Sequence, residues 1–312
     1  MATDVPLAPI RLGTWPTPVE PAPRLAAALG LDILWLKRDD LGGLGGGGNK
    51  VRKLEYTVAQ ARAAGATTLV TTGAAQSNHA RLTAAAAARL GLRAVLVLVG
   101  DAPPAERGNL LLDRLAGAEV VWAGDVPIDG TAEVLEREAQ RVRDAGEVPF
   151  LLPLGGSTPA AAQGYADCAS ELRAQVPDLD RVVVAVGSGG TMAGLVAGLG
   201  SDRVLGVDVG ALSDPVATVT SLVAGMPGVP PPDELWVDAG QVGEGYDTPP
   251  ATAREALLLA ARTEGVFLDP IYTARALAGL AAAVVSGRVA RTDVTVFLHS
   301  GGLPGLFGHE PE

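Results

Sequence analysis

Short apolar runs and longer amphipathic segments alternate along most of this chain. The apolar runs, such as 66–73 and 93–100, are rich in Val, Leu and Thr, which is typical of strands buried on both faces. The segments between them carry apolar residues at helical spacing, as Leu54 and Val58 do within 51–63. Strands of this kind, separated by single helices, pair in parallel and are covered by helices. The pattern therefore predicts an α/β fold.

The same periodicity locates the remaining elements. Strands are predicted at 31–40, 66–73, 93–100, 118–124, 148–156, 181–190, 203–210 and 294–302. Helices are predicted at 51–63, 77–91, 108–117, 131–146, 161–175, 191–200, 214–226, 252–265 and 274–287. The segment 226–250 is rich in Pro and Gly, so we expect an irregular connection around one short strand there. Two α/β layers are expected, and Gly155, Gly156 and Ser157 mark the crossing between them.

Composition and charge limit the classes of partner. The chain has 312 residues, enough for two domains, and its net charge of −11 argues against binding to nucleic acid or to an anionic membrane. No uninterrupted apolar run is long enough to span a bilayer, and residues 1–24 lack the pattern of a signal peptide. We therefore expect a cytoplasmic protein. The charge remains compatible with a small anionic ligand, because a cup of backbone amides binds phosphate whatever the global charge.

One cysteine and three histidines give little basis for a metal site. A single Cys168 excludes an intramolecular disulfide, and its helix-like surroundings predict a small buried residue. The histidines, His79, His299 and His309, lie far apart and form no HxxxH pair, so we predict no metal. His299 lies in an apolar strand and is expected to be a hydrogen-bonded core residue, whereas His309 in the tail is expected to be solvated.

The glycine run 45–48, followed by Asn49 and Lys50 at the start of a predicted helix, is the most informative segment. Glycines permit close approach of a ligand to the backbone, and a helix N-terminus disfavours a nearby cation while it favours anions. A lysine in this position loses its proton more easily than usual and lies beside a natural phosphate site. It suits attachment of a phosphorylated aldehyde, because the neutral amine is the nucleophile. The alternative is a flexible loop that ends in a solvated lysine.

Polar residues also gather in loops that follow apolar runs, which is where ligands bind in parallel sheets. The candidates are Gln76, Ser77, Asn78 and His79, then Gly187, Ser188, Gly189, Gly190 and Thr191, and finally Tyr272 and Ser300. The segment 187–191 precedes a predicted helix and suggests an anion cup, for which an ordinary capped turn is the alternative. It lacks the lysine of a Walker motif. Together with Lys50 it points to pyridoxal phosphate, whereas by itself it also permits a nucleotide-binding Rossmann protein.

Seven blocks in order carry a resemblance to a known family. They are LKRDDLGGLGGGGNKVRKLEY (36–56), TTGAAQSNHARLTAA (71–85), PLGGSTPAAAQGY (153–165), VGSGGTMAGL (186–195), GEGYDTPP (243–250), ARTEGVFLDPIYTARALAGL (261–280) and FLHSGG (297–302). The chain resembles the fold type II pyridoxal phosphate enzymes, and among them the D-cysteine desulfhydrase and 1-aminocyclopropane-1-carboxylate (ACC) deaminase branch. The resemblance implies two doubly wound parallel-sheet domains of the tryptophan synthase β type, with the cofactor in the cleft between them. It also implies a homodimer, a large cofactor-binding domain at 1–48 and 156–312, and a small α/β domain at 49–155.

The resemblance further implies roles for single residues. Lys50 would carry the cofactor and later move the Cα proton of the substrate, while Lys53 would contact the cofactor phosphate unless it is a surface lysine. Asn78 matches the residue that bonds the pyridine 3-hydroxyl, and Ser77 matches the one at the substrate carboxylate and reaction centre. The remaining matches are the phosphate loop at Gly187, Ser188, Gly189, Gly190 and Thr191, two active-site tyrosines at Tyr246 and Tyr272, and Ser300 near the pyridine nitrogen. Gln76 and His79, which flank Ser77 and Asn78, are further candidates for substrate contact.

These matches imply the chemistry. A hydroxyl at Ser300 holds the pyridine nitrogen protonated less well than a carboxylate, which favours expulsion of a β substituent over a long-lived carbanion. We therefore expect α,β-elimination from a small amino acid, with D-cysteine giving pyruvate, hydrogen sulfide and ammonium. Hydroxyl residues at both Thr273 and Ser300 favour this reaction over ACC ring opening. Arg275 stands where members of the family more often have Gly-Lys, and this difference leaves the identity of the substrate undecided.

Several alternatives remain at this point. ACC deaminase activity is one, and a lyase for L-cysteate, a thioether or another β-substituted alanine is another. From a different class come a nucleotide-binding Rossmann-like protein and a non-catalytic metabolite-binding relative.

Overall fold

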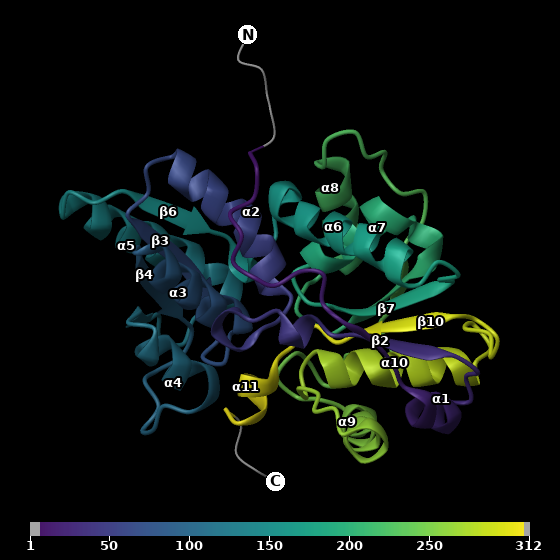
Figure 1. The fold of residues 1–312 in the computed structure, drawn as a ribbon. Helices are drawn as coiled ribbons and strands as arrows, with labels where there is room; N and C mark the ends of the chain where they lie inside the picture. Colours follow the sequence, from purple (N-terminus) through teal and green to yellow (C-terminus); the bar gives the residue numbers. More distant parts are fainter. Residues whose placement is uncertain (1–6, 309–312) are drawn as a thin grey trace.

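The computed structural model describes residues 7–308, which form two lobes around one sheet each (Figure 1). The larger sheet has the order β1-β2-β10-β7-β8-β9 and the smaller one β5-β4-β3-β6. The strands of the larger sheet are β1 (Val19–Pro21), β2 (Leu34–Lys37), β7 (Arg181–Val186), β8 (Val204–Asp208), β9 (Trp236–Asp238) and β10 (Thr295–Leu298). Those of the smaller sheet are β3 (Thr68–Gly73), β4 (Arg93–Leu98), β5 (Glu119–Trp122) and β6 (Pro149–Leu152). Neighbouring strands pair in parallel except β1 with β2, so the predicted α/β class with parallel sheets is confirmed.

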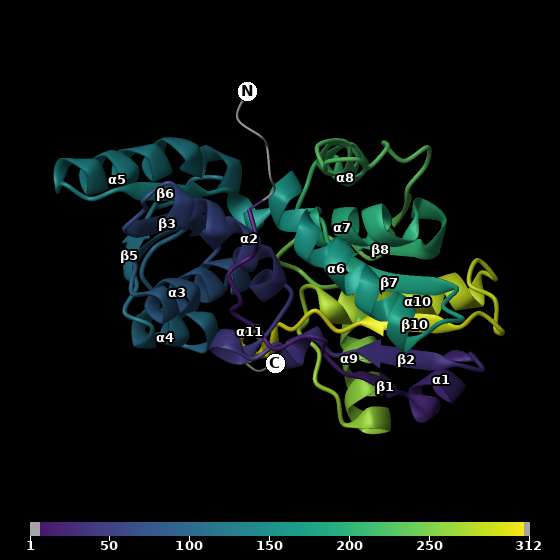
Figure 2. The same cartoon turned by 45° about the horizontal axis from the view of Figure 1, so that its top comes forward.

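Helices connect the strands and cover the sheets. They are α1 (Pro23–Leu29), α2 (Lys50–Ala63), α3 (Asn78–Leu90), α4 (Gly108–Leu115), α5 (Ala132–Asp144), α6 (Pro159–Gln175), α7 (Gly190–Leu199), α8 (Pro215–Ala224), α9 (Ala251–Glu264), α10 (Thr273–Val285) and α11 (Leu303–Leu306). Short 3₁₀ turns occur at Asp39–Leu41, Leu44–Gly46, Ile128–Thr131, Leu154–Gly156 and Ser201–Arg203. In the views of Figures 1 and 2, α2 lies between the two lobes. The periodicity did not predict β1, α1 and α11, because these elements have only 3, 7 and 4 residues, too few for a repeating apolar pattern to stand out.

Both faces of the larger sheet are buried, which explains why its strands are apolar throughout. On β7, Val183 and Ala185 belong to the core under α1, α9 and α10, while Val182, Val184 and Val186 belong to the core under α6, α7 and α8. The smaller sheet is covered by α2, α3 and α4 on one face and by α5 on the other. All of its strands fall within residues 49–155, while the limits proposed for the two domains stay a prediction.

Other expectations from the sequence concern single residues and exclusions. Cys168 is buried, as predicted. His309 lies outside the described residues. Within residues 7–308 no helix is long and apolar enough to cross a membrane, and no cluster of three or more His, Cys, Asp or Glu side chains suits a metal ion.

A buried ion pair fastens α2 to the larger lobe. The Arg52 side chain is 2% exposed; it donates from Nε to Asp39 Oδ2 over 2.8 Å and from two nitrogens to Glu171 over 2.8 Å each. Asp39 is 0% exposed and also accepts from the hydroxyls of Tyr165 and Thr17. Burial opposes its ionisation, but the Arg52 charge and these hydrogen bonds outweigh burial and hold the pKa of Asp39 below its ordinary value. The carboxylate is therefore ionised and fully paired.

This pairing predicts a large loss of stability in Asp39→Asn, because Arg52 is then left buried beside a neutral amide. Removing one partner of a buried pair costs about 3–5 kcal/mol, to be measured as the free energy of unfolding in urea. Asp32→Asn is the matched control, since it breaks an exposed pair with Arg291 over 2.8 Å and such pairs contribute under about 1 kcal/mol. Equal losses in the two variants would contradict the anchoring role of Asp39.

Candidate active site

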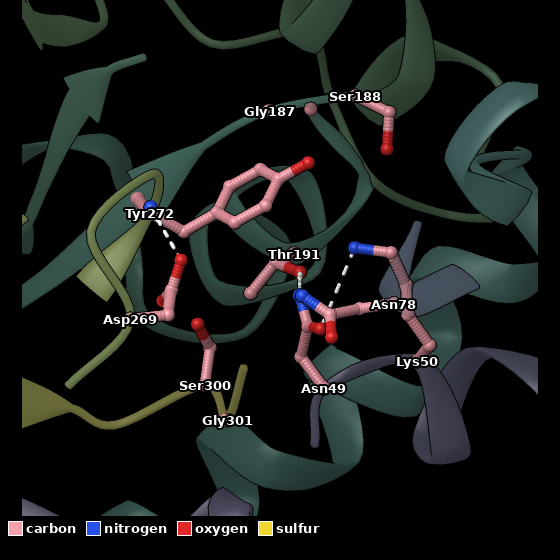
Figure 3. Close-up of a pocket in the computed structure, with 12 residues that line it drawn as sticks. Asn49, Lys50, Asn78, Gly187, Ser188, Thr191, Asp269, Tyr272, Ser300 and Gly301 are labelled. Carbon is pink, nitrogen blue, oxygen red and sulfur yellow. Dashed lines mark hydrogen bonds between the residues drawn. The ribbon is translucent and has the colours of Figure 1, made fainter. Parts of the chain in front are cut away.

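Two connected chambers lie between the lobes, at the carboxyl ends of strands from both sheets. Five residues line both of them: Lys50, Asn78, Gly187, Ser188 and Tyr272. The inner chamber, drawn in Figure 3, adds the polar residues Asn49, Thr191, Asp269 and Ser300. The outer chamber has a volume of about 390 Å³ and adds Ser77, His79, Tyr246 and a set of apolar side chains. The structure therefore brings together nearly all of the site residues predicted from the sequence.

Lys50 presents an amine to the inner chamber at the first residue of α2 (Figure 3). Its Nζ lies 6.0 Å from the centroid of the Tyr272 ring. Its one hydrogen bond within the described part of the chain is a long contact of 3.4 Å to Asn49 Oδ1. Burial, together with the positive charge of Arg81, lowers the pKa of Lys50 to about 8. A substantial fraction of this amine is therefore neutral near physiological pH.

The other two lysines of the chain are fully engaged. Lys37 Nζ donates to Glu171 over 2.7 Å and to Gln175 over 2.8 Å. Lys53 Nζ donates to the Gly155 carbonyl over 2.5 Å and to Ser157 Oγ over 2.8 Å. Lys53 is 1% exposed, so the alternative of a surface lysine is wrong. Only Lys50, among the three, keeps an amine available for chemistry.

Asn78, the first residue of α3, lines the inner chamber together with the loop 187–191. Asn78 Oδ1 accepts from Arg81 over 3.3 Å and from Asn109 over 3.1 Å. These two donors orient the amide of Asn78, so that its nitrogen is left to donate into the chamber. Ser77 caps the helix through its Oγ, which accepts from the Ala80 amide over 3.1 Å, and it lines the outer chamber.

The loop from Gly187 to Thr191 joins β7 to α7 and lies on the inner chamber. A Cβ on Gly187 would lie 3.0 Å from the Tyr272 ring, and one on Gly190 would lie 2.6 Å from Ser157 Oγ, so neither position has room for a side chain. Ser157 Oγ meets Ser188 Oγ at 2.7 Å and accepts from the Gly190 amide over 3.1 Å. Donors thus gather at the N-terminus of α7, where the helix dipole favours an anion.

Ser157 was missed as a site residue. Its position just after β6, in the same GlyGlySer segment that marks the crossing between the layers, was the available signal. Its hydroxyl links the Lys53 amine to the loop 187–191, because it accepts from Lys53 and is also hydrogen bonded to Ser188 and to the Gly190 amide. Neither Lys53 nor Ser157 lines a chamber, so the two hold the loop 187–191 in place through Ser188 and Gly190 rather than face the chambers themselves.

The two predicted tyrosines meet across the outer chamber. The hydroxyls of Tyr246 and Tyr272 share a hydrogen bond, and the ring centroids are 5.9 Å apart in an edge-to-face arrangement. Burial raises the pKa of Tyr246 to about 12 and raises the pKa of Tyr272 well above its ordinary value, so both phenols keep their protons. Arg275 holds the Tyr246 loop in place by donating to the carbonyls of Gly245 over 2.8 Å and Tyr246 over 2.9 Å.

Ser300 follows β10 and is 8% exposed, with its side chain directed into the inner chamber (Figure 3). Asp269 lines the same chamber and was not predicted. Its Oδ1 accepts from the amide and the hydroxyl of Thr273, and its Oδ2 accepts from the amides of Ile271 and Tyr272. Thr273 is therefore hydrogen bonded to Asp269 and lines neither chamber.

Three further polar residues have roles other than a simple ligand contact. Gln76 lines neither chamber, because its side chain accepts from the Asn109 amide over 2.9 Å and donates to the Arg107 carbonyl over 3.1 Å. His79 is 2% exposed at the edge of the outer chamber and shares a 3.0 Å hydrogen bond with Thr71. His299 contacts the Phe267 carbonyl over 3.1 Å, which confirms it as a hydrogen-bonded core residue.

Comparison with known proteins agrees with this geometry. Residues 10–301 match the family described as pyridoxal-phosphate dependent enzyme. The D-cysteine desulfhydrase of Salmonella choleraesuis (strain SC-B67) is 39% identical over 312 residues, which cover 95% of this chain and 94% of that protein. The D-cysteine desulfhydrase of Klebsiella pneumoniae (strain 342) is 38% identical over the same shares of the two chains.

Solved structures show the same relationship. An ACC deaminase homologue superimposes with a TM-score of 0.90 at 33% identity over 96% of this chain and 94% of that one. Maize serine racemase superimposes with a TM-score of 0.68 at 19% identity over 92% and 88%, which is a likeness of fold. The match covers nearly the whole chain, so a nucleotide-binding Rossmann protein is no longer an alternative. The chain belongs to the pyridoxal-phosphate dependent enzymes of fold type II, and within them to the family of the D-cysteine desulfhydrases and ACC deaminases.

Proposed function

We propose that this protein is a carbon–sulfur lyase that eliminates the β substituent of a small amino acid, with D-cysteine as its first substrate. The observation that carries the proposal is the amine of Lys50, which has a lowered pKa, makes only a long contact of 3.4 Å to Asn49 within the described chain, and lines the inner chamber together with the loop 187–191 and Ser300. The D-cysteine desulfhydrases at 38–39% identity support the choice of substrate. We further propose a cytoplasmic homodimer, as in the family that the chain resembles.

The residues of the inner chamber fit pyridoxal phosphate, which is the cofactor of this family. Gly187 and Gly189 line the chamber without side chains, and with the hydroxyls of Ser188 and Thr191 at the N-terminus of α7 they suit the phosphate. Lys50 would hold the aldehyde carbon, and Asn78 and Ser300 would contact the ring oxygen and the ring nitrogen. When bound, the cofactor withdraws electrons from the substrate Cα, which acidifies the Cα proton and permits loss of the β substituent.

The chain's own residues supply the remaining steps of the proposed reaction. The Lys50 amine is the base that takes the Cα proton, because its lowered pKa provides the neutral form. Ser77 and the first amides of α3 bind the substrate carboxylate at the positive end of the helix. Tyr272 and Tyr246 remain protonated, so they donate hydrogen bonds to the departing sulfur rather than accept a proton.

Attachment to Lys50 predicts a specific labelling result. Borohydride reduction of the holoenzyme, followed by peptide mass spectrometry, should show the added cofactor mass on Lys50. Lys37 and Lys53 serve as internal controls, because both amines are already hydrogen bonded. Lys50→Ala should lose the visible cofactor absorbance and pyruvate formation from D-cysteine, since the link and the proton carrier disappear together. Label on Lys53, or pyruvate from the Lys50→Ala variant, would contradict the assignment.

The pKa of about 8 predicts how fast the apoprotein takes up its cofactor at different pH. Only the neutral amine attacks an aldehyde, so the rate should rise about tenfold per pH unit below 8 and level off above it. The rate is measured from the visible absorbance after adding pyridoxal phosphate to the apoprotein. Nα-acetyl-lysine is the control, because its ordinary amine titrates near pH 10.4 and its rate keeps rising to about that value. A protein profile that follows the control would show that Lys50 has no lowered pKa.

The hydroxyl at Ser300 predicts the partition between reactions. A carboxylate in Ser300→Asp would hold a proton on the ring nitrogen, which should raise deuterium exchange at Cα relative to pyruvate formation by at least about tenfold. Ser300→Thr keeps a hydroxyl and is the control. An unchanged ratio in Ser300→Asp would count against the proposed role.

Substrate panels with D-cysteine, L-cysteine, L-cysteate and ACC give pyruvate or 2-oxobutyrate and so distinguish elimination from ring opening.

A further inference from the structure

The outer chamber has an apolar wall that cysteine itself does not require. The side chains of this wall follow the carboxyl ends of strands in both sheets. They are Val99, Val126, Pro127, Leu154, Ala211 and Leu212. Val99, Val126 and Leu154 come after β4, β5 and β6 of the smaller sheet, whereas Leu212 comes after β8 of the larger one. Both lobes therefore contribute apolar side chains to one chamber. This chamber adjoins the inner chamber at Ser188 and Tyr272, which line both.

The polar groups of the outer chamber lie near the reacting centre or at the rim. Ser77 and Asn78 stand at the start of α3 beside the inner chamber, and Asp247 is exposed at the surface. His79 adds no charge, because burial and the cations of Lys53 and Lys50 hold the pKa of His79 well below its ordinary value. Among the described lining residues, Lys50 is thus the one source of positive charge for a departing hydrosulfide ion. Contact with such an apolar wall is more favourable for a thiol that carries an apolar group than for a hydrosulfide ion.

We propose that the preferred substrates are S-substituted cysteines whose sulfur carries an apolar group, and that the outer chamber binds this group. The inference rests on the proposed elimination and names its substrate class. The volume of about 390 Å³ is in the range of pockets that hold small organic molecules. The substituent lies against Val126 and Leu154 while the amino acid part stays at Lys50 and Ser77.

The reaction balances without an oxidant or a reductant. The bond between Cβ and sulfur breaks with its electron pair going to sulfur, which gains a proton and leaves as a thiol. Water hydrolyses the released three-carbon enamine to pyruvate and ammonium. One thioether and one water therefore give one thiol, one pyruvate and one ammonium ion.

The first test measures binding without turnover. Alanine, 2-aminobutyrate, norvaline and norleucine lack a β leaving group and differ by one methylene each, and calorimetry with the holoenzyme gives their dissociation constants. Both enantiomers are titrated. Burial of each methylene in the outer chamber should raise affinity about fourfold. An affinity that stays flat or falls along the series would overturn the inference, whether or not the protein eliminates anything.

The second test measures turnover and locates the contact. S-methyl-, S-ethyl- and S-propyl-cysteine release thiols of similar acidity, so the slope of kcat/KM along the series reports binding of the alkyl group. The slope should be about fourfold per methylene in the wild type and should fall in Val126→Thr and Leu154→Asn. Val148→Thr and Leu115→Asn are matched controls at exposed positions, 43% and 71% exposed, and should keep the wild-type slope.

The outcomes separate the inference from the function on which it rests. Pyruvate from D-cysteine with no gain along the thioether series would overturn the inference and leave the elimination standing. No pyruvate from cysteine or from any thioether would overturn the elimination itself. An unchanged slope in both Val126→Thr and Leu154→Asn would show that the alkyl group binds elsewhere, which also overturns the inference.

Discussion

The site depends on the buried pairing of Arg52 with Asp39 and Glu171, because this pairing fixes the helix that carries Lys50. Residues two apart on a helix point to nearly opposite sides, and residues three apart point to the same side. Arg52 is therefore turned toward the larger lobe, while Lys50 lines the inner chamber and Lys53, on the same side of the helix as Lys50, is hydrogen bonded outside it. Rotation of α2 would bury the Lys50 amine elsewhere and leave Arg52 without its carboxylates. The ion pair sets the rotation of the helix as much as it adds to stability.

The electrostatics of the cleft follow from this placement. Lys50, Lys53 and Arg81 lie close together in a chain with an overall charge of −11, and the pKa values of all three are lowered, with burial as the main cause. A cluster of cations with little solvent is costly without an anion, so the cleft favours a ligand that brings negative charge. Burial, together with the positive charge of Arg81, lowers the pKa of Lys50 and so makes its amine nucleophilic. An anionic cofactor, once attached through the neutral amine of Lys50, would reduce the repulsion among these cations.

Much of this arrangement was predictable from the sequence. The glycine run before Lys50, the loop at 187–191 and Ser300 each follow or precede a strong periodic element, and the rule that ligands bind at the carboxyl ends of parallel strands brings them together. Gln76 was misjudged because position in a loop does not tell which way a side chain points; here it turns back to hold the start of α4. Ser157 was missed because its partners Lys53 and Ser188 are distant in sequence. The strand β1 and the helices α1 and α11 were not predicted, because none is longer than seven residues and so short an element gives no clear repeating pattern.

Asp269 shows why proximity alone does not decide the chemistry of the inner chamber. A carboxylate beside the ring site would be expected to hold a proton on a pyridine nitrogen, which would oppose elimination. Yet both oxygens of Asp269 are already engaged by the amides of Ile271, Tyr272 and Thr273 and by the Thr273 hydroxyl. The carboxylate of Asp269 thus stabilises the N-terminus of α10 and holds the backbone of Tyr272 in place. In the proposed reaction the hydroxyl of Ser300 would therefore be the group that meets the ring nitrogen, and the weak electron sink would depend on how completely the hydrogen-bonding capacity of Asp269 is used.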